Sequence, residues 1–389
     1  MAFLYRIVWK SAISEKEVPC MRLVRAVAVL LTLAMLVAVF PVAVSAATAD
    51  GFEYTVDNST NTVQIIRYSG NAEVLTVPSE IGGLPVTAIA PFAFNECHSI
   101  RELTVSGSVA QISDYAFFYC NNLEKVTVNE GVKSIGSWAF GDCKSLISIS
   151  LPNGLERIGD CAFVFASSLK SLVIPRTVTS IGKSILSGCD SLTELSVKEG
   201  NSVYHSTSNC IIETERKVLF IGCRTSVIPA DGSVTVIGNS AFYDCSKLNT
   251  VDIPSTVTKI SNAAFKDCEN ITTVILPAAL TYIGDNAFQR CANIDTVYYK
   301  GTSRQWKNVE IGEYNDPLFE ATLVVNKVSG DIDGDGRVTG IDSNLIVRML
   351  AEGVQESTDS ERFSAADVNK DGRLNSIDAN AVKRLIKGS

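Results

Sequence analysis

Two twelve-residue stretches near the C-terminal end carry acidic and polar side chains at alternating positions. The first reads DIDGDGRVTGID, from Asp331 to Asp342, and the second reads DVNKDGRLNSID, from Asp367 to Asp378. Calcium is a hard cation that takes about six to eight oxygen ligands, and a twelve-residue loop supplies them from positions 1, 3, 5, 7, 9 and 12. The pattern therefore predicts two calcium ions, one in each loop.

Each loop offers side-chain oxygens together with one main-chain carbonyl at position 7. The expected ligands of the first loop are Asp331, Asp333, Asp335, Arg337 (through its carbonyl), Thr339 (directly or through water) and Asp342. Those of the second loop are Asp367, Asn369, Asp371, Arg373 (through its carbonyl), Asn375 and Asp378. Gly336 and Gly372 occupy position 6, where the sharp turn favours a residue without a Cβ atom. Position 12 is Asp rather than the Glu of an EF-hand, so each following helix must come closer to its ion.

Apolar residues follow both loops at helical spacing, so we expect a helix to leave each loop. A shift of 36 residues superposes Asp331 on Asp367. The same shift relates two apolar sets, Leu345, Ile346, Met349 and Leu350 with Ala381, Val382, Leu385 and Ile386. No helical pattern precedes the first loop. Residues 331–389 are therefore expected to form a small all-α module of two similar halves that pack together.

A loop and an exiting helix in each half resemble a type I dockerin. The resemblance implies binding to a cohesin module of a scaffoldin, through loop positions 10 and 11 and nearby helix residues. The residues at the matching positions are Gly340, Ile341, Val347, Arg348, Ser376, Ile377, Lys383 and Arg384. Gly340 is unusual for a recognition residue. The sequence therefore does not decide whether the first half, the second half or both halves make the main contact with the cohesin. The resemblance also implies a cellulosome-like setting, in which polysaccharides are degraded. The alternative to cohesin binding is that the module holds two structural calcium ions and has no partner.

The preceding part of the chain repeats with a period of 23 residues. A phenylalanine marks each unit, except for one unit with leucine at this position, and an isoleucine lies five residues before it and usually a cysteine three residues after it. The marked positions are Phe94, Phe117, Phe140, Phe163, Leu186, Phe242, Phe265 and Phe288. Each unit is too short to bury its own core, so stacked units must share one continuous core.

This pattern resembles the BspA-like leucine-rich repeats of bacterial surface proteins, over 51–326. The resemblance implies a right-handed leucine-rich-repeat solenoid with short parallel strands along one side. Members of this family commonly act in adhesion or macromolecular binding. The expected contact surface consists of the outward strand positions Thr104, Thr127, Ser150, Val173, Ser196, Asp252, Ile275 and Tyr298.

The repeat is interrupted by an insert near 198–226. Two β-rich runs there, Cys210–Ile212 and Lys217–Ile221, predict a hairpin that projects from the stack. We favour the interpretation that this hairpin is a variant of the repeat that changes the curvature of the solenoid. The alternative is that it forms a ledge for recognition of a partner. The ends of a solenoid need caps. We expect a hairpin around Asp57–Thr62 at the front and the segment Val297–Gly312, with Trp306, at the back.

Residues 1–46 have the features of an export signal. Arg22 and Arg25 precede an apolar run, and Val44-Ser45-Ala46 offers small residues for cleavage. Met21 is the favoured true start, and an uncleaved membrane anchor is the alternative. No later segment is apolar enough to span a membrane, so we expect a secreted, extracellular protein, associated with the cell surface or a cellulosome. Residues 327–330 would be a short linker.

The charge and the reactive residues narrow the function further. The chain carries a formal charge of −8 although its leader is basic, so nucleic-acid binding is not expected. Seven cysteines share one repeat position, where buried thiols are favoured over disulfides, and zinc is not expected. His98 and His205 are the only histidines, and no nucleophile motif accompanies them. We therefore expect a non-catalytic binding or adhesion subunit whose ligand is a surface protein or a polysaccharide. A structural spacer, or an unrecognised hydrolase or protease modulator, is the alternative.

Overall fold

The computed structural model describes residues 47–325, 331–332, 337–352, 363, 365–368, 370 and 373–388. The expected export signal over 1–46, with Met21, and the expected linker over 327–330 lie outside these residues. None of the helices in the described ranges is long and apolar enough to cross a membrane. Residues 47–325 form a β-solenoid, and the residues from 331 onward form a small helical module with a hydrophobic core of its own.

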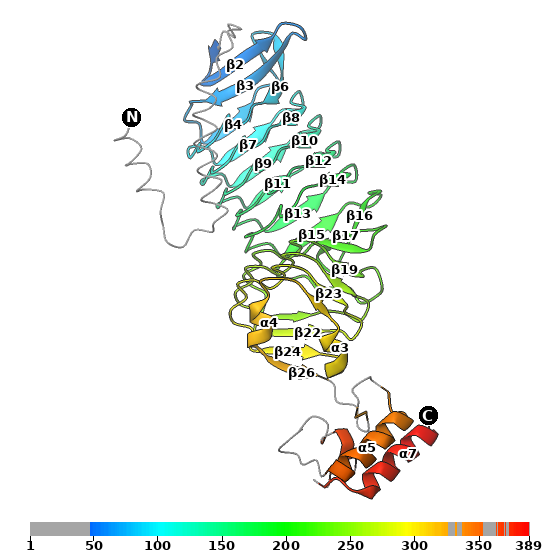
Figure 1. Cartoon of the computed structure of the whole chain (residues 1–389). Coiled ribbons are helices and arrows are strands. Elements are labelled where there is room, and N and C mark those ends of the chain that lie inside the picture. The colour runs from blue at the N-terminus through cyan, green and yellow to red at the C-terminus, as the bar shows by residue number, and fades with distance from the viewer. Residues whose placement is uncertain are drawn as a thin grey trace, which may run out of the picture. The chain divides into compact units, whose positions relative to one another are not determined.

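Each repeat forms one coil with two short strands, and the strands of successive coils stack in parallel into two rows (Figure 1). The first row contains β4 (Val74–Val77), β7 (Glu102–Val105), β9 (Lys125–Val128), β11 (Ser148–Ser150), β13 (Ser171–Ile174), β15 (Glu194–Val197), β20 (Thr250–Asp252), β22 (Thr273–Leu276), β24 (Thr296–Tyr299) and β26 (Thr322–Val325). The second contains β6 (Leu84–Ile89), β8 (Gln111–Ile112), β10 (Ser134–Ile135), β12 (Arg157–Ile158), β14 (Ser180–Ile181), β19 (Val236–Ile237), β21 (Lys259–Ile260), β23 (Tyr282–Ile283) and β25 (Glu310–Ile311).

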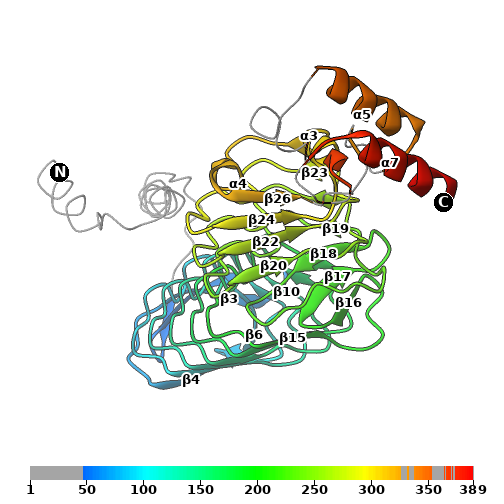
Figure 2. The ribbon, with the colours of Figure 1, turned by 90° about the horizontal axis from the view of Figure 1, so that it is seen from below.

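The predicted leucine-rich-repeat solenoid is confirmed. The expected parallel strands along one side are present, but the structure adds a second row of short strands. The second row centres on the isoleucine of each repeat, which is buried while the residue before it stays at least partly exposed. This two-residue alternation is too short to be distinguished from a turn in the sequence, yet neighbouring coils supply its hydrogen-bond partners. Figure 2 shows the strands β20, β22, β24 and β26 of the first row beside one another.

A column of phenylalanine rings fills the centre of the stack. Phe94, Phe117, Phe140 and Phe163 are fully buried. Their successive ring centroids are 4.6, 5.1 and 6.0 Å apart, with interplanar angles of 19°, 1° and 12°. Phe242, Phe265 and Phe288 form a second column with spacings of 5.0 and 5.1 Å. Offset or parallel stacking adds to the burial of apolar surface, so one aromatic position per repeat holds neighbouring coils in register.

Main-chain hydrogen bonds on the turn side connect each coil to the next. In the coil of Phe117, three N–H groups at alternate residues donate to the following coil: Tyr115 to Ser137 at 2.8 Å, Phe117 to Ala139 at 2.8 Å and Tyr119 to Gly141 at 2.9 Å. The residues two before and two after the marked position have φ between +52° and +63° wherever they are not glycine. This left-handed conformation is unfavourable for bulky residues, so the three bonds and the packing must offset its cost.

The repeat cysteines also join neighbouring coils, as thiols. Ten free cysteines lie in the described ranges. Cys120 donates to the Phe94 carbonyl at 3.1 Å, and Cys143 donates to the Phe117 carbonyl at 3.2 Å. Cys268 and Cys291 donate in the same way to the carbonyls of Phe242 and Phe265, each at 3.0 Å. A small side chain with a weak donor therefore fits this position, in agreement with the buried thiols favoured by the sequence.

The front cap is the predicted hairpin. Strands β2 (Phe52–Asp57) and β3 (Thr62–Tyr68) pair in antiparallel fashion, and β1 (Ala47–Ala49) extends them. The ring of Tyr68 stacks on Phe94 with centroids 5.4 Å apart. At the back, Val297–Gly312 was expected to depart from the repeat, yet it contains β24 and β25, which pair in register with the preceding coils. Helices α3 (Ser303–Lys307) and α4 (Asp316–Glu320) replace the usual turns there, and the Trp306 ring lies 5.2 Å from that of Tyr299.

The insert is a hairpin, but it does not project from the stack. Strands β16 (Tyr204–Thr207), β17 (Cys210–Glu213) and β18 (Val218–Ile221) are antiparallel neighbours. Strand β18 then pairs in parallel with β19 of the next repeat. The hairpin therefore continues the second strand row, because this arrangement satisfies edge groups that a projecting hairpin would leave unpaired.

The C-terminal module contains helices α5 (Gly340–Glu352) and α7 (Ser376–Gly388). Its core includes Ile332, Ile346, Met349, Ala366, Ala379 and Val382, with Leu345, Leu350 and Ile386 packed against them. The predicted packing of the two halves is therefore observed for most positions. Leu385 is an exception, since 44% of it is exposed. It lies next to the exposed Arg384, on the outer side of α7, whereas its counterpart Met349 is buried.

Candidate metal centre and contact surfaces

The last carboxylate of the first loop, Asp342, is fully buried at the start of α5. Its Oδ1 atom accepts a hydrogen bond from the main-chain N–H of Ile332 at 2.8 Å. Its Oδ2 atom accepts bonds from the N–H of Thr339 at 2.7 Å and from the Thr339 hydroxyl at 3.2 Å. Asp342 therefore joins the beginning of the loop to the first turn of the helix, where a negative charge is favourable.

The second loop repeats this arrangement. Asp378 is also fully buried, and its Oδ1 atom accepts a hydrogen bond from the N–H of Val368 at 3.1 Å. Its Oδ2 atom accepts a bond from the N–H of Asn375 at 3.0 Å. The side chains of Thr339 and Asn375, expected as ligands, accept from the N–H groups two residues later at 3.2 and 2.7 Å. The expected 36-residue symmetry thus extends to individual hydrogen bonds.

The carboxylates at the two ends of each loop fit a cation. Asp331 and Asp367 are 5% and 8% exposed, and each precedes the residue whose amide bonds the last carboxylate of its loop. Carboxylates withdrawn from water are stable when a cation or other compensating partners lie nearby, and oxygen donors suit calcium. The arrangement can therefore bind a hard cation in each half, with Asp342 and Asp378 held ready at the helix starts.

Several predicted ligands cannot be placed. Asp333, Asp335, Asn369 and Asp371 lie outside the described residues, as do Gly336 and Gly372. Among the residues that are described, no three His, Cys, Asp or Glu side chains form a metal-binding group. The carbonyl of Arg373 accepts from the Asn375 side chain at 3.5 Å, while the Arg337 and Arg373 side chains are exposed. The complete ligand set remains a prediction.

All eight expected partner-binding residues lie on the surface of the module. Ile341 and Ile377 are 59% and 60% exposed, and Val347 is 52% exposed. The other exposed members of the set are Gly340, Arg348, Ser376, Lys383 and Arg384. Within each helix they form two pairs of adjacent residues, and the second pair follows the first by seven residues, so each set shares one face. The two faces share an exposed isoleucine and an arginine, and the second carries Lys383 where the first carries Val347.

The expected contact positions on the solenoid lie side by side on the first strand row. Thr104 is in register with Thr127, and Thr127 with Ser150. Val173 is in register with Ser196, and Asp252, Ile275 and Tyr298 follow one another. Val173 and Tyr298 are each 44% exposed. The later part of this face is therefore more apolar, as the sequence indicated.

A surface row of aromatic rings on the turn side was missed in the sequence. The rings of Phe92 and Tyr115 stack with centroids 4.8 Å apart, and those of Tyr115 and Trp138 with centroids 6.0 Å apart. Phe118 packs edge-on against both Tyr115 and Trp138. These residues are half-buried. The signal was present, since three of them lie two residues before the marked position of successive repeats.

Neither histidine lies in an arrangement that suggests acid–base chemistry. His98 makes an edge contact with the Tyr119 ring, with centroids 5.8 Å apart. The Nδ1 atom of His205 and the Thr214 hydroxyl are 2.8 Å apart within the insert. Both contacts are local to the repeat or the hairpin.

Comparison with known families identifies both parts of the chain. The family described as BspA type leucine rich repeat region matches residues 87–212 and 213–313. The family described as Dockerin type I domain matches residues 329–387. The chain therefore belongs to the BspA-type leucine-rich-repeat proteins, and it carries a type I dockerin at its C-terminal end. Calcium is the ion characteristic of that dockerin class, and neither family description names a catalytic activity.

Solved structures support the solenoid fold. A leucine-rich repeat protein from Bacteroides ovatus is 22% identical, with 72% of this chain and 71% of that chain covered and a TM-score of 0.50. The pneumococcal vaccine antigen PcpA is 17% identical, with 71% of this chain and 86% of that chain covered and a TM-score of 0.52. At these identities the similarity concerns the fold alone. The search of curated proteins gives no match.

Proposed function

We propose that this protein is an exported, non-catalytic subunit of a cellulosome-type assembly. Its dockerin binds a cohesin of a scaffoldin in the presence of two calcium ions, and its solenoid presents a binding surface to a protein or a polysaccharide. The protein would thus be extracellular and held near the cell surface or the fibre through the scaffoldin.

The matched carboxylates Asp342 and Asp378 carry this proposal. Both are buried, and both make the same bonds to the start of their loop and to the start of their helix. A module with so small a core gains much of its stability from bound metal. The exposed pair Ile341 and Ile377 then gives each half an apolar contact point for a partner.

The test is calcium-dependent cohesin binding by the mature full-length chain. Immobilised scaffoldin cohesins should retain the protein with calcium, release it with chelator and retain it again when calcium is restored. Retention that does not change with chelator would contradict the proposal. The double variant Asp342→Asn, Asp378→Asn is the matched control, because its dockerin is impaired while its solenoid is unchanged. Incubating this variant with insoluble plant polymers and surface proteins measures binding by the solenoid separately.

A further inference from the structure

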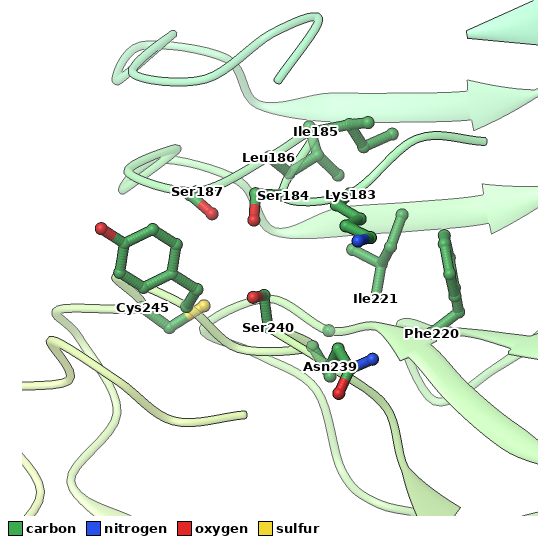
Figure 3. Close-up of a pocket in the computed structure, with 13 residues that line it drawn as sticks. Lys183, Ser184, Ile185, Leu186, Ser187, Phe220, Ile221, Asn239, Ser240 and Cys245 are labelled. Carbon is green, nitrogen blue, oxygen red and sulfur yellow. The ribbon is translucent and has the colours of Figure 1, made fainter. Parts of the chain in front are cut away.

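The stack is interrupted where the insert enters the repeat, after the coil of Leu186. In Figure 3, Ser184 of this coil and Ser240 of the coil of Phe242 lie on opposite sides of a small space, which has room for about one water molecule. The hydrophobic core divides into two clusters in the same region. Contacts among the coils before the insert therefore matter for their stability, and one of these contacts joins an amine to an amide.

The amine of a lysine and the side-chain amide of an asparagine meet across two coils in this part of the solenoid. Lys198 follows β15, and its Nζ atom donates at 2.7 Å to the Oδ1 atom of Asn153, which follows β11. The two residues are 45 positions apart in the sequence. The Nζ atom thus lies close to the carbonyl carbon of the amide, which is the atom that an amine attacks.

The carboxylate of Glu130 contacts the same amide. Its Oε1 atom accepts hydrogen bonds from the Asn153 main-chain N–H at 2.9 Å and from Asn153 Nδ2 at 3.0 Å. Its Oε2 atom accepts a bond from the N–H of Gly154 at 3.2 Å. These bonds, led by the one from the Asn153 main chain, lower the pKa of Glu130, and the charge of Lys198 adds to the effect. The carboxylate is therefore ionised near neutral pH and can accept a proton.

The loop between the two reacting residues holds them in place. The hydroxyl of Thr177, on this intervening loop, donates to the main-chain carbonyl of Asn153. The side chain of Asn201, three residues after Lys198, donates to the carbonyl of Val178 at 2.8 Å. Both outer loops are thus bonded to the loop between them, so little further ordering is needed to bring the amine and the amide together.

We propose that Lys198 and Asn153 form an intramolecular isopeptide bond, with Glu130 as the catalytic residue that transfers the proton. The neutral amine of the lysine attacks the amide carbon, the bond between that carbon and Nδ2 breaks, and ammonia leaves. Glu130 accepts a proton from the attacking nitrogen and passes it to the departing nitrogen. One amide replaces another, so the reaction needs neither an oxidant nor a cofactor.

The bond would close a covalent loop across the coils that precede the insert. Such a cross-link stabilises a fold mainly by restricting the unfolded chain. The inference concerns the chain's own modification, so it does not depend on the proposed function.

Matched variants separate the reaction from the other contacts of the same residues. Lys198→Arg keeps the positive charge and the hydrogen-bond donors but provides no nucleophilic amine. Glu130→Gln keeps an acceptor for the main-chain bonds but cannot take up a proton in this way. Lys300→Arg is the control, because the amine of Lys300 lies 3.1 Å from the side chain of Asp252, and an ionised carboxylate does not react with an amine.

The experiment is mass spectrometry of the mature full-length protein, as purified and after incubation at about pH 9, where more of a lysine amine is neutral. The wild type and Lys300→Arg should each be lighter than their sequence by one ammonia molecule. After digestion with trypsin, the peptide Ser145–Arg157 should be joined to Ser184–Arg216, because trypsin does not cleave after a modified lysine. Lys198→Arg should give no joined peptide, and Glu130→Gln should form it about a hundredfold more slowly.

Three results would overturn the proposal. The first is a wild-type chain that loses no ammonia throughout the incubation, or that only gains the mass expected when Asn153 is converted to Asp. The second is a loss of ammonia that persists in Lys198→Arg, which would indicate a succinimide at Asn153-Gly154 instead. The third is a joined peptide that forms in Glu130→Gln at the wild-type rate, which would exclude proton transfer by Glu130.

Discussion

The carboxylate of Asp342 accepts a hydrogen bond from the amide of Ile332 at 2.8 Å, across ten residues of the first loop. The counterpart in the second loop, Asp378 to Val368, is 3.1 Å. Each bond brings the last expected ligand of a loop beside the first expected one, so the ends of both loops are held together. A metal ion that binds between them then meets carboxylates that are already positioned, which lowers the cost of ordering the loop.

Neutralising the last carboxylate of one loop should therefore weaken calcium binding in that loop and leave the other loop unaffected. Asp342→Asn or Asp378→Asn should each abolish or strongly weaken one of two binding events in a calcium titration by calorimetry. Each should also destabilise the module by about 1.5–3 kcal/mol, the range for hydrogen bonds to a charged group. Asp252→Asn, on the solenoid surface, should leave both events unchanged. Two unaltered events in either dockerin variant would argue against the assigned ligands.

The similar exposure of Ile341 and Ile377, 59% and 60%, predicts that either half can contact a cohesin. Ile341→Asp and Ile377→Asp should each leave binding within about tenfold of the wild type, while the double variant should lose it, because a buried apolar contact is replaced by a charge. Surface plasmon resonance on immobilised cohesin measures this. Complete loss in one single variant would instead assign the contact to that half alone.

Phe140 should contribute strongly to the stability of the coils that share the first column of phenylalanine rings. It is fully buried between Phe117 and Phe163, so Phe140→Ala removes two ring contacts and leaves a cavity. The expected loss is about 3–5 kcal/mol in urea unfolding of the solenoid. Val173→Ala, at a position that is 44% exposed, should change the free energy of unfolding by less than about 0.5 kcal/mol. Similar losses in the two variants would contradict the continuous aromatic core.

The stability of the solenoid should fall as the pH rises from about 4 to about 7. Burial, followed by the charges of Asp267 and Asp190, raises the pKa of Asp244 to about 7 from an ordinary value of 3.8. The folded protein then holds a proton that the unfolded chain has lost, so folding is favoured at low pH and this contribution is lost by about pH 7. Thermal unfolding at several pH values should show this slope.

Asp244→Asn should make the slope smaller without removing it, because burial also raises the pKa of Asp267. Asp231→Asn is the control, since hydrogen bonds from Ser233 lower the pKa of the exposed Asp231 instead. An unchanged slope in the Asp244 variant would show that other groups control the pH dependence.

The buried thiols of the solenoid should be unreactive in the folded protein. Burial raises the pKa of Cys97, Cys210 and Cys291 to about 12, so these groups carry very little thiolate at pH 8. Ellman's reagent should react slowly with the native protein and rapidly with all ten mature-chain thiols after denaturation. Fewer reactive thiols in the denatured, unreduced protein would instead indicate disulfides.

The periodic parts of the fold were predictable because each unit repeats the same physical problem. In most units one phenylalanine, one isoleucine and one small residue recur at fixed spacing, so the stacked core follows from the sequence. The front cap follows because the end of a solenoid must cover its apolar face. The second strand row was not predicted, since two residues show no distinguishable alternation. The orientation of the insert was not predicted, because the parallel pairing of Val218 with Val236 depends on the next coil.

The sequence by itself determined which residues belong to the dockerin and the repeats, because oxygen ligands and core residues must recur at fixed intervals. Only the tertiary structure showed that Asp342 and Asp378 tie each loop to its helix, since these bonds join residues ten positions apart. It also showed that the insert joins the next coil through the main-chain N–H of Gly222, which donates to the Ala241 carbonyl at 2.9 Å. A main-chain donor has no signature in the sequence, and whether it is satisfied depends on the neighbour that the fold brings against it.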